Sequence, residues 1–173
     1  MKFYKNENDI LFLSIKPEFA EKIFEGSKRV ELRKSRPKVQ IGDCVIIYVT
    51  NPVKAVRGVF RVKGLIESKP EDLWISHREI LGIDLKSFKD YYQGSVLSIG
   101  IEIEEVIEFK KEVSLETIRK FIPKFTPPQT YRYFAPSLVS HFLYTKKRVL
   151  KDLFSVSSSG SRRQRVPLAS ALF

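Results

Sequence analysis

One stretch decides the fold predicted for this chain: Gly26-Ser27-Lys28-Arg29-Val30-Glu31-Leu32-Arg33. It follows a predicted helix and opens a predicted strand, because Val30 and Leu32 alternate with charged residues at the period of a half-buried strand. The alternation places Glu31 on one face together with the two arginines. Lys28 is expected on the opposite face, with the two apolar residues.

A lysine, a carboxylate and an arginine so close to a chain reversal have two interpretations. In the first, Lys28, Glu31 and Arg33 form a polar constellation at the mouth of a cleft. In the second, they are charges on a solvated strand edge that discourage aggregation. On these residues alone, the solvated edge is the favoured interpretation.

Composition predicts the kind of protein and its partners. The 173 residues suffice for one domain with an appendage, and the formal net charge of +11 favours acidic partners, most often nucleic acid. Cys44 is the one cysteine and cannot form an internal disulfide, which fits a reducing compartment. No apolar run approaches the ~20 residues of a membrane span, and Glu7 and Asp9 interrupt any signal-peptide core. The predicted location is the cytoplasm, with no membrane partner.

The remaining periodicity predicts strands interleaved with short helices. Strands are expected at 10–15, 44–49, 55–66 and 97–109, and helices after Lys16-Pro17, after the capping-box pattern at 68–71, after Asp84 and from Ser114. Val56, Phe60, Val62 and Ile66 are expected on one face of the long strand. Gly58 and Gly64 interrupt that face and predict bulges, as a small barrel needs at its corners. This order favours α+β over a parallel doubly wound sheet.

The C-terminal third is expected to change character along its length. Residues 125–134 are predicted to be a rigid, irregular and aromatic segment, because they include two consecutive prolines and several aromatic residues. Residues 136–154 are predicted to form a last helix packed on or beside the domain. Residues 155–173 are rich in serine and arginine and are predicted to be a flexible basic tail.

With these segments placed, the chain resembles the ASCH family of the PUA-like superfamily over residues 8–135. The family signature is Gly-x-Lys-x-x-Glu-x-Arg after the first helix, and every named position is present in the opening stretch, at Gly26, Lys28, Glu31 and Arg33. The surrounding order is also similar. It comprises Lys16-Pro17, Gly42-Asp43, Pro52-Val53-Lys54-Ala55-Val56 with Gly58, and Pro127-Pro128-Gln129 followed by Tyr131-Arg132-Tyr133.

The resemblance implies a small, partly open β-barrel with flanking short helices and a cleft beside the first helix. It also implies binding of RNA or another nucleic acid, with the signature residues lining the cleft. One branch of the family is reported as ribonucleases, and another hydrolyses acetylated cytidine with a lysine, a threonine and a glutamate. Glu31 stands where that second branch has its threonine, and only Glu67, Glu102 and Glu104 are candidates for its glutamate.

Several side chains are candidates for contact with nucleic acid. Arginine can grip phosphate bidentately, lysine acts as a point charge, and aromatic rings stack on bases. Arg57 and Arg61, with Lys63, form either a phosphate track or a solvated outer face, and both interpretations stay open. Tyr133 and Phe134 are expected to cover the open end of the barrel. The candidate binding residues are Lys16, Lys28, Glu31, Arg33, Arg57, Arg61, Gln129, Tyr131 and Arg132.

The predicted function is an RNA-preferring nucleic-acid-binding module that holds a single-stranded or modified nucleotide in this cleft. The alternative is a metal-independent ribonuclease, or an amidohydrolase on a modified nucleoside, with Lys28 and Glu31 as catalytic residues. A third reading is an adaptor that recruits partners through the last helix and tail; no particular protein partner is predicted. No metal or cofactor is expected, because His77, His141 and Cys44 are widely separated in sequence.

Overall fold

A computed structural model of the chain describes residues 9–143. The predicted tail at 155–173 and the part of the predicted last helix beyond residue 143 lie outside the described residues. The elements, in chain order, are β1 (Ile10–Ile15), α1 (Pro17–Phe24), β2 (Val30–Arg33), β3 (Cys44–Val49), β4 (Ala55–Ser68), α2 (Pro70–Leu81), α3 (Leu85–Tyr92), β5 (Ser98–Ser114), α4 (Leu115–Phe121), β6 (Tyr131–Phe134) and α5 (Pro136–Phe142).

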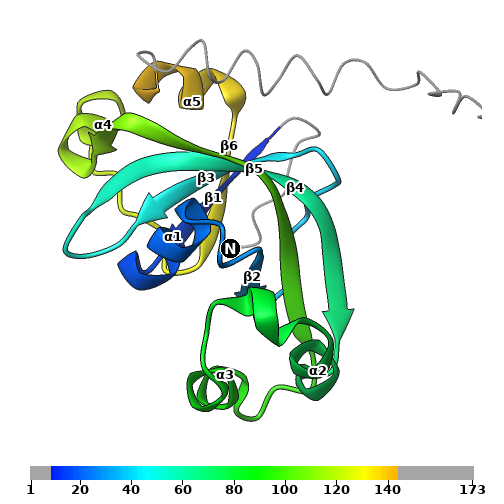
Figure 1. The fold of residues 1–173 in the computed structure, drawn as a ribbon. Coiled ribbons are helices and arrows are strands. Elements are labelled where there is room, and N and C mark those ends of the chain that lie inside the picture. Colours follow the sequence, from blue (N-terminus) through cyan, green and yellow to red (C-terminus); the bar gives the residue numbers. More distant parts are fainter. Residues whose placement is uncertain (1–8, 144–173) are drawn as a thin grey trace, which may run out of the picture.

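The described strands form one six-stranded sheet in the order β2-β5-β4-β3-β1-β6. Only β1 and β3 pair in parallel, and the other neighbours are antiparallel. The sheet curls into a half-barrel, and the long strands β4 and β5 extend beyond it to carry α2 and α3 (Figure 1). The predicted α+β class and barrel-like sheet are confirmed.

Bulges in the pairing of β4 with β5 bend the two long strands. The register shifts between Val56 and Gly58 and again between Val62 and Gly64, so the bulges predicted at the two glycines are confirmed. A further shift lies between Val59 and Arg61. Each bulge changes which residues face inward, and Val56 therefore belongs to a different core cluster from Val62. The single apolar face predicted for this strand is wrong for that reason.

Two core clusters lie on opposite faces of the sheet. Alternate residues of β1 divide between them: Phe12 is buried in one, and Leu11 and Leu13 are buried in the other. The first cluster is covered by α4 and α5, and the second is covered by α1 (Figure 1).

A third core cluster belongs to a lobe formed by α2 and α3. Val30 and Leu32 of β2 pack there against Leu73, Leu81, Phe88 and Tyr92. One set of β2 side chains is therefore committed to this lobe, and the alternate set, Glu31 and Arg33, is left for the other side of the strand.

Two local expectations are wrong. The capping box predicted at residues 68–71 does not form, because α2 begins at Pro70 and its N-cap residue is Lys69, whose side chain has no acceptor and makes no capping hydrogen bond. The segment predicted to be irregular contains β6, which pairs antiparallel with β1. Its prolines precede the strand, so they do not interfere with this pairing.

Gly58 allows β4 to approach β5 and α1 closely, and a substitution there tests this packing. A Cβ atom at Gly58 would lie 2.4 Å from the carbonyl oxygen of Ile107 and 2.7 Å from Phe24 Cε1. We expect Gly58→Ala to lower the free energy of unfolding by about 3 kcal/mol, measured by urea denaturation. Gly94→Ala is the control, because its Cβ would meet no atom within 4 Å although φ is +72°, and we expect a loss of about 1 kcal/mol. Equal losses in the two variants would contradict this account.

Candidate functional site

A cavity of about 630 Å³ lies between α1, β2 and the lobe. Its walls come from elements far apart in the sequence: the end of β1, the start of α1, β2, α3 and the segment before β6. The lining residues are Ser14, Ile15, Lys16, Glu18, Phe19, Lys28, Glu31, Leu32, Arg33, Thr50, Ile83, Ser87, Asp90, Tyr91, Gln129 and Thr130.

Glu31 is the centre of a buried charged triad. One carboxylate oxygen, Oε1, accepts a hydrogen bond of 2.8 Å from Arg33, and the other, Oε2, lies 3.7 Å from Lys28 Nζ. All three side chains are less than a tenth exposed. The solvated strand edge, favoured on the residues alone, is therefore wrong, and the three charges lie together in the wall of the cavity.

Lys28 joins the triad although strand alternation placed it on the other face. The alternation does not reach it, because β2 begins only at Val30 and the chain turns just before Lys28, at Gly26, where φ is +83°. Its Nζ donates a 2.6 Å hydrogen bond to the carbonyl of Leu81, the last residue of α2. Burial lowers the pKa of Lys28, the Glu31 carboxylate opposes this shift, and the Arg33 cation adds to it.

Arg33 connects the triad to the far end of the sheet. Its Nη2 atom also donates to Ser14 O of β1 at 3.4 Å, and its Nη1 donates to Thr130 O at the same distance. The Nε of Arg33 is buried and has no hydrogen-bond partner among the residues that the structure describes. The guanidinium therefore keeps one unpaired donor in a wall of the cavity.

The aromatic part of the lining comes from both sides of the cavity. Phe19 of α1 lies 5.4 Å, measured to its ring centroid, from Lys28 Nζ. Tyr91 of α3 donates a hydrogen bond of 3.3 Å from its hydroxyl to Leu32 O, and burial raises its pKa. Both rings flank a space in which the polar groups of Thr50 and Gln129 are also present.

Sequence reasoning missed several lining residues. Ser14, Thr50, Ser87, Asp90 and Tyr91 belong to no motif, and only the folding of α3 against β2 brings the last three to the site. The periodicity of α3 places Tyr91 on its inward side, but it contains no information about which strand that side meets.

Of the predicted binding residues, five line the cavity: Lys16, Lys28, Glu31, Arg33 and Gln129. Arg57 and Arg61 lie elsewhere. Arg57 makes ion pairs with Glu21 and Glu108, and Arg61 donates to Glu105 at 2.8 Å and to a backbone carbonyl.

The two other predicted residues lie on β6, beside the cavity rather than in it. Tyr131 donates from its hydroxyl to Arg36 O at 3.4 Å, and its ring packs edge-on to Tyr133. Arg132 points to the opposite face of β6, where its guanidinium lies over the ring of Phe134. Phe134 is buried, in the first core cluster.

Residues 9–143 contain neither a metal-binding cluster nor a membrane-crossing helix. No group of three or more His, Cys, Asp and Glu side chains there is arranged to hold a metal ion. None of the helices in this part of the chain is long and apolar enough to cross a membrane.

Comparison with known proteins identifies the class of protein. The sequence model of the ASCH domain matches residues 13–124, and the chain belongs to the ASCH domain family. An ASCH domain-containing ribonuclease of Zymomonas mobilis is 25% identical over 118 residues, which are 68% of this chain and 79% of that protein.

Solved structures show the same fold. The crystal structure of ASCH from Zymomonas mobilis superposes with a TM-score of 0.75 at 22% identity, covering 80% of this chain and 96% of that one. The N-terminal domain of Staphylothermus marinus McrB gives a TM-score of 0.55 at 13% identity, covering 79% and 93%. The sheet described above is therefore a PUA-like sheet of the ASCH type.

The lowered pKa of Lys28 gives a pH dependence of stability with a defined sign. The folded protein releases this proton at lower pH than the unfolded chain, in which the lysine pKa is near 10.5. Between the two values the unfolded state binds more protons, so stability rises with pH. We expect the free energy of unfolding of the wild type, relative to Lys28→Met, to increase as the pH is raised from 7 toward 10.5.

Urea denaturation at constant ionic strength measures both proteins, and Lys28→Met is the matched control because it removes the titrating amine and keeps an unbranched side chain; its loss of contacts with Glu31 and Leu81 lowers stability, but only the change with pH is compared. A difference between the two proteins that stays constant with pH, or that falls, would contradict the assignment.

Proposed function

We propose that the chain binds single-stranded nucleic acid, RNA in preference to DNA, and holds one unpaired or modified nucleotide in the cavity. One observation carries the proposal: Lys28, Glu31 and Arg33 are buried side by side in the wall of an open cavity. A stable fold has no need of three buried charges at this place, because apolar residues of similar size are often at least as stabilising.

The size and lining of the cavity suit a nucleotide. Its volume of about 630 Å³ lies within the range of small-ligand sites. Phe19 and Tyr91 offer ring surfaces for stacking, and Gln129 offers both donors and acceptors to a base edge. Lys16 lies exposed at the mouth, where a phosphate can approach it.

Each member of the triad has a suitable role. The Glu31 carboxylate can accept a hydrogen bond from an exocyclic amino group, as acidic side chains do from cytosine. The terminal nitrogens of Arg33, whose bonds to Ser14 O and Thr130 O are both 3.4 Å, can donate to a carbonyl or phosphate oxygen. A base that is paired and stacked within a duplex cannot reach into a recessed cavity, so the ligand must be single-stranded or extruded.

The preference for RNA is supported by the family relative from Zymomonas mobilis, which is named a ribonuclease. That name also raises a second candidate function, cleavage of RNA without a metal ion. The observation that favours it is the buried Lys28 amine, with its lowered pKa, beside the Glu31 carboxylate. An amine of this kind can accept a proton at lower pH than an exposed lysine can. The amidohydrolase alternative has less support, because Glu31 stands in place of the threonine.

Substitutions in the cavity test the binding proposal. We expect Lys16→Gln and Glu31→Gln each to weaken binding of a fluorescent single-stranded RNA by at least about tenfold, since each removes a polar contact to the ligand. Fluorescence anisotropy measures the affinity. Lys16 is exposed, so its substitution leaves the core intact. Lys110→Gln on β5 is the control, with the same charge change away from the cavity, and its affinity should stay within about twofold.

The salt dependence of the wild type gives an independent measure. With ~4 phosphate contacts, the slope of log K against log salt for a single strand is near −3. An affinity that does not change with salt would contradict nucleic-acid binding at this site.

Incubation with labelled RNA in the presence of a chelator separates the two candidate functions. For a binding module, the RNA stays intact while bound. If the wild type cleaves the RNA and both Lys28→Ala and Glu31→Gln do not, the protein is a ribonuclease and the proposal of a binding module is overturned. Acetylated cytidine, assayed under the same conditions, tests the amidohydrolase alternative.

A further inference from the structure

We propose a second contact surface for the RNA, which begins at the wall of the cavity, extends away from it and holds the nucleotides flanking the one inside. It consists of the segment 34–38 and the three tyrosines beside it, Tyr91, Tyr131 and Tyr133, and is here called the flanking surface. This inference rests on the proposed function, because it extends the path of the same RNA strand.

The flanking surface begins at the wall of the cavity. Lys34 directly follows Arg33 of the triad, and its Nζ lies 5.2 Å from the ring centroid of Tyr91, which lines the cavity. Gln129 and Thr130, also in the lining, lead directly into β6 and Tyr131. An RNA strand that leaves the cavity on this side therefore meets Lys34 and Tyr131 next.

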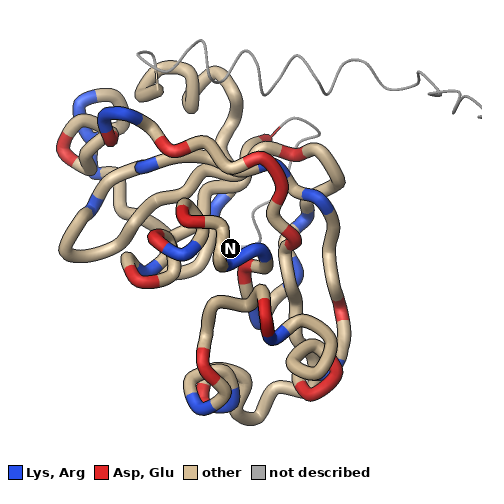
Figure 2. Tube along the Cα trace, in the orientation of Figure 1, with Lys and Arg blue, Asp and Glu red and all other residues tan. Residues whose placement is uncertain are grey.

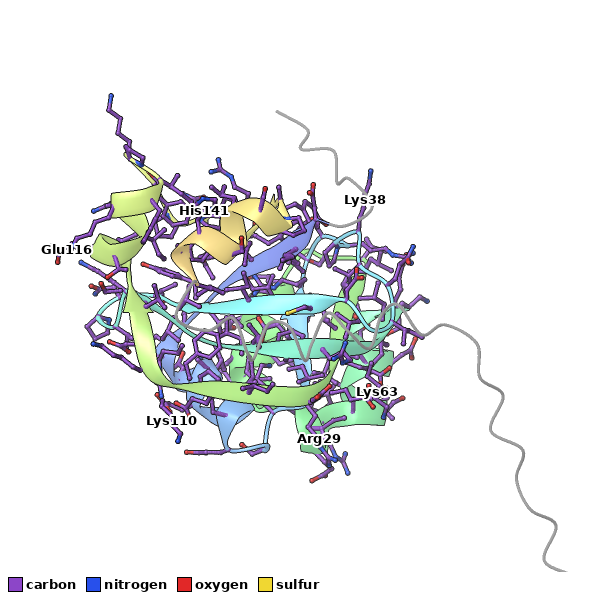
Figure 3. All side chains as sticks on the ribbon, turned by 90° about the horizontal axis from the view of Figure 1, so that it is seen from above. Arg29, Lys38, Lys63, Lys110, Glu116 and His141 are labelled. Atoms are coloured by element: carbon purple, nitrogen blue, oxygen red, sulfur yellow. The ribbon has the colours of Figure 1, made fainter. Side chains whose placement is uncertain are left out.

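Hydrogen bonds from the tyrosines fix the backbone of segment 34–38. Tyr131 donates from its hydroxyl to Arg36 O at 3.4 Å, and the backbone N–H of Lys38 donates to the Tyr133 hydroxyl at 2.5 Å. Pro37 is buried, whereas the side chains of Lys34, Arg36 and Lys38 are exposed. Figure 3 shows Lys38 pointing away from the body of the protein. The surface thus presents three cations from a fixed backbone.

Half-buried tyrosine rings lie between this segment and the sheet. Tyr131 and Tyr133 pack edge-on with their ring centroids 5.9 Å apart, and both are only partly covered. Alternating cations and partly exposed rings are the combination that single strands require, because phosphates meet the cations and bases stack on the rings. An acidic peptide would use the cations but would have no use for the rings.

The positive charge of segment 34–38 is not simply part of a basic surface over the whole described chain. Much of the formal charge of +11 comes from lysines and arginines beyond residue 143, and over the described elements basic and acidic residues are interspersed (Figure 2). Lys110 and Lys111, for example, are flanked by Glu108 and Glu112. Among residues 34–38 there is no carboxylate, and the ion pair that Arg36 makes with Glu67 is exposed. Such a pair contributes less than ~1 kcal/mol, so a phosphate can replace it.

The test measures how the effect of substitutions on RNA affinity depends on the length of the RNA. Affinities of fluorescent oligocytidylates of two and nine nucleotides are measured by anisotropy for the full chain, for Lys34→Gln combined with Lys38→Gln, and for Lys110→Gln combined with Lys111→Gln. The second pair makes the same charge change, and Lys110 lies at the opposite end of the molecule from Lys38 (Figure 3). All proteins are first compared by thermal unfolding.

We expect the wild type to bind the longer RNA more tightly. Loss of two phosphate contacts should weaken binding of the nine-nucleotide RNA by about 20-fold at 0.1 M salt and make the salt slope shallower by about 1.4. Binding of the dinucleotide should change by less than about twofold. The control pair should leave both affinities unchanged.

Two other results have distinct meanings. If the dinucleotide binds but the Lys34 and Lys38 substitutions have no greater effect on the longer RNA than the control pair, the flanking surface is refuted and the cavity proposal stands. If neither RNA binds to the wild type, the proposed function fails, and the flanking surface fails with it. Binding of an acidic peptide in place of RNA, lost in the same double variant, would assign the surface to a protein partner and overturn the inference.

Discussion

The structure depends on the pairing of one buried carboxylate. Glu31 lies on a strand that is buried along its whole length, where an unpaired charge would cost several kcal/mol, so both of its oxygens need cationic partners. Lys28 and Arg33 supply them from the same short stretch. Removing either cation would leave the carboxylate undercompensated, so this stretch is needed for folding as well as for the proposed binding. A buried ion pair is weak evidence for stability, and its position in a cavity wall is the reason for proposing a role in recognition.

The two cations also position the walls of the cavity. Lys28 binds the carbonyl of Leu81 at the end of α2, and Lys22 binds the next carbonyl, that of Gly82, at 2.8 Å. Both ammonium groups thus lie at the negative end of this helix. Gly82 has φ of +66°, and a Cβ there would lie 2.7 Å from Lys28 Cβ, so glycine is required on both counts. Arg33 makes the corresponding connection to β1 and to the segment before β6. The distance between the lobe and the sheet is therefore set by the residues that would bind the ligand.

Sequence reasoning predicted the elements better than the site. The strands at 10–15 and 44–49 follow from local periodicity, and the bulges from Gly58 and Gly64, because these signals lie within each segment. The edge strand β6 was missed, since its four residues become a strand only by pairing with β1, more than a hundred residues earlier. Lys28 was assigned to the wrong face because alternation was extended into a turn. Tyr91 was missed as a site residue because a cavity wall made of distant elements has no signature in any one of them.

The cavity and the basic segment beside it differ in the kind of discrimination they can provide. Inside, cations and carboxylates are balanced: Lys16, Lys28 and Arg33 face Glu18, Glu31 and Asp90 in the lining. Such a site has little net attraction for phosphate, and a ligand binds well there only if its donors and acceptors match those of the lining. Affinity for the polyanionic backbone would then come from the proposed flanking surface, where the ion pair of Arg36 with Glu67 is exposed. Dividing the two tasks in this way would let a protein whose described residues are only weakly basic discriminate between nucleotides without binding every strand tightly.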